Sequence, residues 1–86
     1  MITGSNKIFV HDGREFHLQA EDLGVEAKVF EMRVYDKGTV LWQKRVSYEE
    51  ILAQDLPRQE FEQALRTKME KTILTVEAGI AKGKIG

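Results

Sequence analysis

The chain contains no cysteine and only one proline among its 86 residues. The absence of cysteine excludes disulfides, thiolate metal sites and cysteine nucleophiles, and it is typical of proteins in a reducing compartment. No apolar run approaches the ~18 residues needed to cross a membrane, and the first residues lack the basic start and apolar core of a signal peptide. We therefore expect a cytoplasmic protein without a membrane segment.

The chain also lacks an excess of charge of either sign, since 13 basic side chains face 14 acidic ones. With 42% hydrophobic and 31% charged residues, its composition is that of an ordinary globular protein. We expect one domain over residues 1–86, with residues 1–6 and 81–86 frayed. A domain of this size buries only about 60 to 65% of its unfolded surface, so a partner would add to its stability.

The spacing of the apolar residues changes once along the chain. It is near two up to Ser47 and near 3.6 beyond Tyr48, which is the pattern of strands followed by helix. We therefore predict an α+β fold, in which a four-stranded antiparallel β-meander packs against a long C-terminal helix, with a short helix before it. The expected strands are residues 7–10, 14–21, 27–35 and 39–47.

The first hairpin has two possible registers. A turn signal at residues 11–13 joins the first two strands. A two-residue loop pairs Phe9 with Phe16, whereas a three-residue loop pairs Ile8 with Phe16. A slip of one residue exchanges the faces of Ile8 and Phe9, and both registers stay open on the sequence alone.

The second hairpin is predicted to turn through residues 36–38 as a three-residue loop that ends on a left-handed glycine. This loop pairs Met32 with Trp42 and gathers the apolar side chains on one face. A two-residue loop would pair Met32 with Gln43 and mix apolar with polar side chains. Lys44 falls on the apolar face, where its stem is expected to pass the helix and reach water.

Two helices are predicted after the sheet. Ser47 lies three residues before Glu50, which is the spacing of a capping box, so a short helix should begin at Tyr48. Pro57 suits the first turn of a second helix, whose apolar residues recur at spacings of three and four.

The long helix is expected to extend beyond the sheet. A helix of about 23 residues spans roughly 35 Å, whereas strands of about nine residues span about 30 Å and overlap less when they twist. The surplus apolar surface predicts a protein partner, and a homodimer is the simplest, because most small oligomers have two-fold symmetry. The candidate interface residues are Ile73, Leu74, Val76 and Ile80.

The sequence holds no constellation typical of an enzyme. Its seven glycines never frame a lysine as in a nucleotide loop, and its serines have no evident base beside them. We therefore expect no catalytic residue, cofactor or metal. The second strand does present one polar face, whose side chains, about 6 to 7 Å apart along the strand, are loosely spaced for one metal ion. These candidate ligand-binding residues are Glu15, His17, Gln19 and Glu21.

Nucleic-acid binding is a further possibility on the sheet face. Tyr35 could stack on a base, with Arg33 and Arg45 beside it to hold phosphates. A single aromatic side chain and a net charge of −1 make this a weak site.

Residues 13–24 read GREFHLQAEDLG, and Ser47-Tyr48 precedes the predicted helices. This pattern resembles a group of small bacterial proteins with a GR-x-F-H-x-Q-T-E-D-x-G stretch, a later serine-tyrosine pair and a C-terminal helix. Ala20 stands where that stretch has threonine. Because no activity is assigned to the group, the resemblance implies a bacterial source and a stand-alone domain, and it transfers no functional residue.

The function that the sequence favours is a small non-catalytic protein-interaction or regulatory module. The first alternative is a domain that binds a small ligand or metal on the polar face of the His17 strand. The second is a weak nucleic-acid binder that uses the sheet face.

Overall fold

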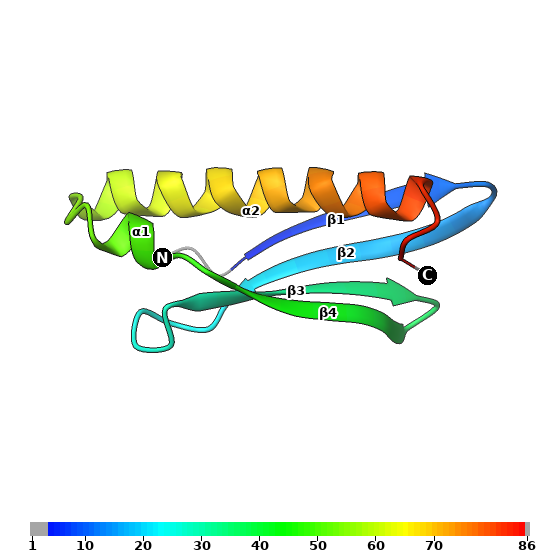
Figure 1. Ribbon diagram of the computed structural model, residues 1–86, viewed down its shortest axis with the longest axis horizontal. Coiled ribbons are helices and arrows are strands. Elements are labelled where there is room, and N and C mark those ends of the chain that lie inside the picture. The colour runs from blue at the N-terminus through cyan, green and yellow to red at the C-terminus, as the bar shows by residue number, and fades with distance from the viewer. Residues whose placement is uncertain (1–3, 86) are drawn as a thin grey trace.

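The computed structural model describes residues 4–85 and confirms the predicted α+β fold (Figure 1). The strands form one antiparallel sheet in the order β1-β2-β3-β4, and α2 packs along one of its faces. Residues 1–3 and 86 lie outside the described residues. The other segments expected to fray are partly ordered, because residues 4–6 belong to β1 and Ala81 ends α2. The elements are β1 (Gly4–His11), β2 (Arg14–Asp22), β3 (Val29–Asp36), β4 (Thr39–Ser47), α1 (Glu49–Leu52) and α2 (Arg58–Ala81).

The first hairpin adopts the register of the two-residue loop. Asp12 and Gly13 both have positive φ angles, of 51° and 76°, which is the conformation of the tight turns that suit twisted strands. Phe9 consequently pairs with Phe16. Because paired residues share a face, Phe9 lies on the side of α2 and Ile8 on the opposite side.

The second hairpin also turns through two residues, so the predicted three-residue loop is wrong. Lys37 and Gly38 have φ angles of 52° and 83°, and Asp36 pairs with Thr39. Asn-Gly is the favoured pair for such a turn because both residues adopt positive φ. Lys37 fills the first position at some conformational cost, while Gly38 fills the second without strain.

A two-residue loop without a bulge would place Trp42 on the face of the sheet opposite α2. A β-bulge in β4 prevents this exchange of faces. The register shifts between the pairs of Val34 and Tyr35, so that Val34 pairs with Trp42 and Tyr35 with Val40, and Leu41 is the additional residue. Trp42 therefore stays on the apolar side of the sheet. Lys44 also lies on this side, since it pairs with Met32, a residue of the core.

Substitutions in this turn should change stability in opposite directions. Gly38→Ala is expected to lower the free energy of unfolding by about 1 kcal/mol, because the Cβ atom of alanine makes the left-handed backbone conformation unfavourable. Lys37→Asn should raise it, because asparagine tolerates the same conformation better than lysine. Urea denaturation of both variants measures the two effects, and equal destabilisation by the two substitutions would contradict the assigned turn.

The core lies between the sheet and α2. Glu77 of α2 forms an ion pair of 2.7 Å with Lys7, which also fixes the helix to β1. Among residues 4–85, no helix is long and apolar enough to cross a membrane. The buried core side chains are Phe16, Leu18, Ala20, Phe30, Met32, Val34, Tyr48, Ile51, Leu65, Met69, Ile73, Val76 and Ile80.

The apolar overhang expected at the end of α2 is absent from the structure. Ile73 is only 3% exposed, and Val76 and Ile80 are also buried in the core, so these three side chains are not available to a partner. Leu74, which lies off the buried stripe, is 57% exposed. The sheet thus reaches further along the helix than the simple comparison of lengths predicts.

The beginning of α2 is covered by α1 and the segment that precedes it (Figure 1). Tyr48 is fully buried, its ring meets Phe61 edge-on at 5.9 Å, and its hydroxyl donates a 2.6 Å hydrogen bond to Asp22 Oδ1. Asp22 Oδ1 also accepts the N–H of Gly24 at 2.9 Å. This cluster joins the end of β2 to the start of the helices.

The predicted capping box is not formed. Ser47 Oγ accepts the N–H of Glu49 at 3.2 Å, one residue earlier than the expected partner. Glu50 instead pairs with Lys68 on α2, and the Lys68 ammonium lowers the pKa of the Glu50 carboxyl below its ordinary value. An ion pair between two helices thus takes the place of the local cap.

Candidate functional site

The face of the sheet opposite α2 is the main candidate site. Phe16, Leu18 and Ala20 of β2 are buried beneath the helix, so the alternate residues of that strand point the other way. Within residues 4–85, no helix packs on this second face, which we call the open face. The four candidate ligand-binding residues all lie on it, namely Glu15, His17, Gln19 and Glu21.

Side chains of the open face form three rows that cross all four strands. Each row follows from the strand register, because directly paired residues of an antiparallel sheet lie on the same face. The apolar row is Ile8, His17, Tyr35 and Val40. The middle row is Asn6, Gln19, Arg33 and Gln43, and the charged row is Gly4, Glu21, Glu31 and Arg45.

The apolar row includes large hydrophobic side chains that are exposed to solvent. Ile8 is 56% exposed and Val40 44%, and Val10, one step further along β1, is 62% exposed. These three residues are half of the large hydrophobic side chains exposed within residues 4–85. Exposed apolar side chains gathered on one face are typical of an interaction surface, whereas scattered ones are not.

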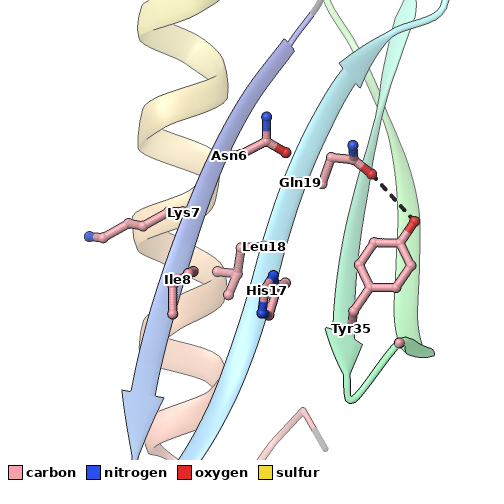
Figure 2. Close-up of a pocket in the computed structure, with 8 residues that line it drawn as sticks. Asn6, Lys7, Ile8, His17, Leu18, Gln19 and Tyr35 are labelled. Carbon is pink, nitrogen blue, oxygen red and sulfur yellow. Dashed lines mark hydrogen bonds between the residues drawn. The ribbon is translucent and has the colours of Figure 1, made fainter.

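A shallow hollow of about 740 Å³ lies over the same part of the sheet (Figure 2). His17 and Gln19 rise from β2 at its centre, and Tyr35 leans across from β3, its hydroxyl donating to Gln19 Oε1 at 3.3 Å. This volume is within the range of small-molecule pockets, but the hollow is open along the face rather than enclosed.

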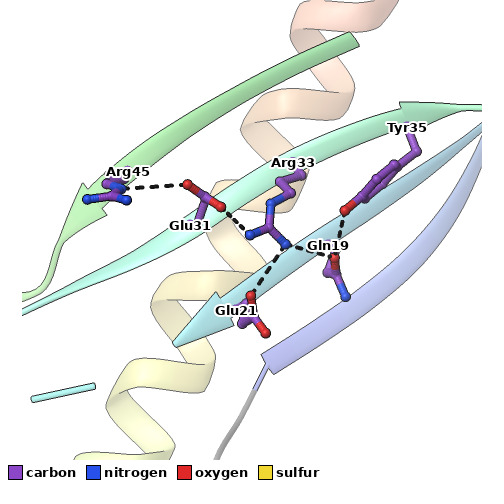
Figure 3. A network of polar contacts seen from close by, with 6 residues as sticks. All are labelled: Gln19, Glu21, Glu31, Arg33, Tyr35 and Arg45. Atoms are coloured by element: carbon purple, nitrogen blue, oxygen red, sulfur yellow. Dashed lines mark hydrogen bonds and ion pairs between the residues drawn. The ribbon is translucent and has the colours of Figure 1, made fainter. Parts of the chain in front are cut away.

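The other end of the open face is a network of paired charges (Figure 3). Arg33 Nη1 donates to Gln19 Oε1 at 3.4 Å and to Glu21 Oε1 at 3.3 Å, and the guanidinium also pairs with Glu31. Arg45 Nε lies 3.6 Å from the second oxygen of Glu31. Two cations therefore face two carboxylates, and the network leaves little net charge on the surface.

Arg33 is the centre of this network. Partial burial by itself lowers the pKa of its guanidinium, but the hydrogen bonds and charges of Glu31 and Tyr35 outweigh that effect and raise the pKa above its ordinary value. Arg33 therefore stays charged and is hydrogen-bonded to both Gln19 and Glu21.

The candidate ligand-binding residues share a face but divide into two pairs. His17 Nε2 lies 3.3 Å from Glu15 Oε1, and both side chains are more than half exposed. Gln19 and Glu21 are both engaged by Arg33 instead. Among the described residues, no group of three His, Asp or Glu side chains is placed to hold a metal ion.

The residues considered for nucleic-acid binding also lie on the open face. Tyr35 and Arg33 lie on β3 in the apolar and middle rows, and Arg45 lies on β4 in the charged row, so Tyr35 and Arg45 are separated by the middle row. Glu31 pairs with both arginines and offsets the charge that would hold phosphates.

The exposed apolar residues of β1 and β4 are functional candidates that the sequence reasoning missed. Placing Ile8 beside His17 requires the register of the first hairpin, and placing Val40 beside Tyr35 requires the bulge of the second. The signal that could have found them is the turn chemistry, because Asp-Gly at residues 12–13 is the favoured pair of a two-residue hairpin loop.

Compared with known proteins, the chain matches no protein-family model, no curated protein and no solved structure. Its function is therefore inferred from the geometry of its own surfaces.

Proposed function

We propose that the protein is a non-catalytic interaction module that associates with a second copy of itself through the open face. The observation that supports this most strongly is the apolar row, in which Ile8 and Val40 stay largely exposed at opposite edges of the sheet. Between them lie His17 and Tyr35, which present flat rings for packing. Covering the row would remove this apolar surface from water.

The charges of the open face favour a copy of the same chain as the occupant. Glu21 and Glu31 are paired with Arg33 and Arg45 within one molecule. This leaves the exposed Glu15 beside His17 as a further carboxylate of this face, so two open faces repel each other only weakly. Nucleic acid would require a basic face, whereas this one places the carboxylates of Glu15, Glu21 and Glu31 against Arg33 and Arg45. A two-fold axis that lies between the two open faces and parallel to the sheets would place each apolar row against its counterpart.

The size of the open face sets the expected strength of association. Four strands about 4.8 Å apart, each about eight residues long, cover roughly 500 Å². Two such faces reach only the lower limit for specific interfaces, which is about 1,000 Å² in total. We therefore expect a reversible dimer with a dissociation constant of roughly micromolar order.

A small ligand in the hollow is the second candidate function. The hollow above His17, Gln19 and Tyr35 supports it, because an imidazole, an amide and a phenol converge there. Such a ligand would compete with the second copy for the same face. Binding without any self-association would favour this candidate over the dimer.

Sedimentation equilibrium of two single variants tests the dimer. Ile8→Glu is expected to raise the dissociation constant at least about 100-fold, because it would bury a charge without a partner in the interface. Leu74→Glu is the matched control, since Leu74 is equally exposed but lies on α2. It should leave the dissociation constant within about twofold of the wild-type value.

Both variants should keep the circular dichroism and melting temperature of the wild type, because each replaces an exposed side chain. A wild-type chain that stays monomeric up to about 1 mM would contradict the proposal. Equal weakening by the two variants would also contradict it, because the interface would then include α2.

A further inference from the structure

A second surface lies between the edge strand β4 and α2. The helix packs mainly on β1 and β2, which leaves β4 at the uncovered side of the sheet. A groove of about 510 Å³ runs between the two elements. We call it the α2–β4 groove. Its apolar walls come from Trp42, Val46, Val76 and Ile85, and the lysines on it are Lys44, Lys82 and Lys84.

One wall of the groove is an edge strand with a free side. β4 is nine residues long and pairs only with β3 within the described sheet, so its outer backbone N–H and C=O groups have no strand partner there. Such an edge can accept an additional strand through main-chain hydrogen bonds. The bulge at Leu41 lies near the turn, and the pairing is regular from Trp42 onward.

The opposite wall is shaped to leave space for another chain. The helix residues that line the groove are mostly small, namely Thr72, Thr75, Ala78 and Gly79. A Cβ atom on Gly79 would lie 3.0 Å from Ile85 Cδ1, so glycine allows Ile85 to fold back and close one end. A strand added to β4 would direct every second side chain into this space.

The charges of the groove favour an added strand that carries acidic side chains. Lys44, Lys82 and Lys84 form no ion pair with any acidic side chain of residues 4–85, in contrast to Lys7 and Lys68, which are paired. β4 itself carries two cations and no carboxylate. A second β4 would therefore be repelled, whereas an acidic strand is complementary.

We infer that the α2–β4 groove binds an extended acidic peptide segment of another protein as a fifth strand of the sheet. Every second side chain of the segment enters the groove, where apolar side chains lie beside Trp42 and Val46 and carboxylates lie beside the lysines. Association through the open face would leave this edge free, so the two surfaces can act independently. The module would then present one peptide site per copy.

Fluorescence of Trp42, the only tryptophan of the chain, reports directly on the groove. The probe is a blocked nine-residue peptide in which every second residue faces the groove, and these positions are valine and glutamate in turn, with threonine at the positions between them. We expect a saturable blue shift, because the peptide excludes water from the indole, and an affinity that falls as salt is raised. The same peptide with lysine in place of glutamate should bind at least about tenfold more weakly.

Charge reversal tests the assigned site. Lys82→Glu combined with Lys84→Glu should weaken binding of the glutamate peptide at least about tenfold. Arg66→Glu is the control, because Arg66 is an exposed cation of α2 that does not line the groove, and it should change the affinity less than about twofold. Ile8→Glu, which alters the open face, should also bind the peptide normally.

Hydrogen exchange identifies the strand addition itself. The bound peptide should slow the hydrogen exchange of amides in β4. A second peptide, with proline at the alternate positions whose N–H groups point toward β4, should not bind, because proline lacks the N–H that donates to β4. Unchanged tryptophan emission, equal binding of the lysine peptide, or binding without protection of β4 would each overturn the inference. None of these results bears on self-association through the open face.

Discussion

Ile73→Ala is expected to lower the free energy of unfolding by about 3 kcal/mol, whereas Leu74→Ala should change it by less than about 0.5 kcal/mol. The two residues are adjacent on α2 but differ in surroundings. Ile73 is 3% exposed and packs in the core, so its truncation leaves a cavity under the helix. Leu74 is 57% exposed, and its truncation removes little buried surface.

Urea denaturation followed by circular dichroism measures both changes in free energy. The slope of the transition should stay the same in the two variants, because neither alters the surface exposed on unfolding by much. Equal destabilisation by the two substitutions would contradict the burial of Ile73 and the exposure of Leu74 on α2. Loss of dimer in Ile73→Ala at concentrations where the monomer stays folded would point to the originally expected interface on the helix.

Tyr48→Phe is expected to lower the free energy of unfolding by about 2 kcal/mol at neutral pH. The phenol is fully buried and donates to Asp22 at 2.6 Å. Removing the hydroxyl leaves one carboxylate oxygen with the Gly24 N–H as its remaining described partner. The cost is larger than for a neutral pair because the acceptor is charged.

The effect of Tyr48→Phe should also depend on pH. Burial, together with the hydrogen bond to Asp22 and its charge, raises the pKa of Tyr48 well above the ordinary value of 10.0. A raised pKa contributes stability that is complete below the unfolded pKa and is lost as the pH rises above it. The wild type should therefore lose stability above about pH 10 more steeply than the variant.

The two stability curves, measured from pH 7 to about pH 11, should accordingly approach each other at the alkaline end. The two proteins differ only in this phenol, so the difference between the curves isolates Tyr48. A difference that stays constant over this range would contradict the account of the buried phenol.

The fold class could be predicted from the sequence because its signals are local. The change of apolar period at Ser47 and the single Pro57 divide the chain into sheet and helices without knowledge of any distant contact. The first hairpin was also within reach, since Asp12 and Gly13 allow only a small set of turns.

The register of the second hairpin could not be predicted in the same way. The expectation assumed that packing would choose the loop, but a bulge at Leu41 lets a two-residue turn satisfy the same packing. In the structure Lys37 and Gly38 both have positive φ angles, which is the backbone conformation of the two-residue turn. Trp42 and Lys44 reach the expected face by this different route.

The position of α2 depended on contacts that no local pattern contains. The comparison of helix and strand lengths placed the surplus near Ile80, whereas the chain covers the start of the helix with α1 and buries Ile80 against the sheet. The open face shows the same limit. Its polar strand was evident from His17 and Glu15, but the apolar neighbours across β1 and β4 follow only from long-range pairing.

Amide chemical shifts followed over a hundredfold dilution, from about 1 mM to 10 µM, test the central claim most directly. We predict that the amides of Ile8, His17, Tyr35 and Val40 shift together and fit one dissociation constant, while those on the outer side of α2 stay unchanged. Shifts that are independent of concentration, or that cluster around Leu74 instead, would contradict association through the open face.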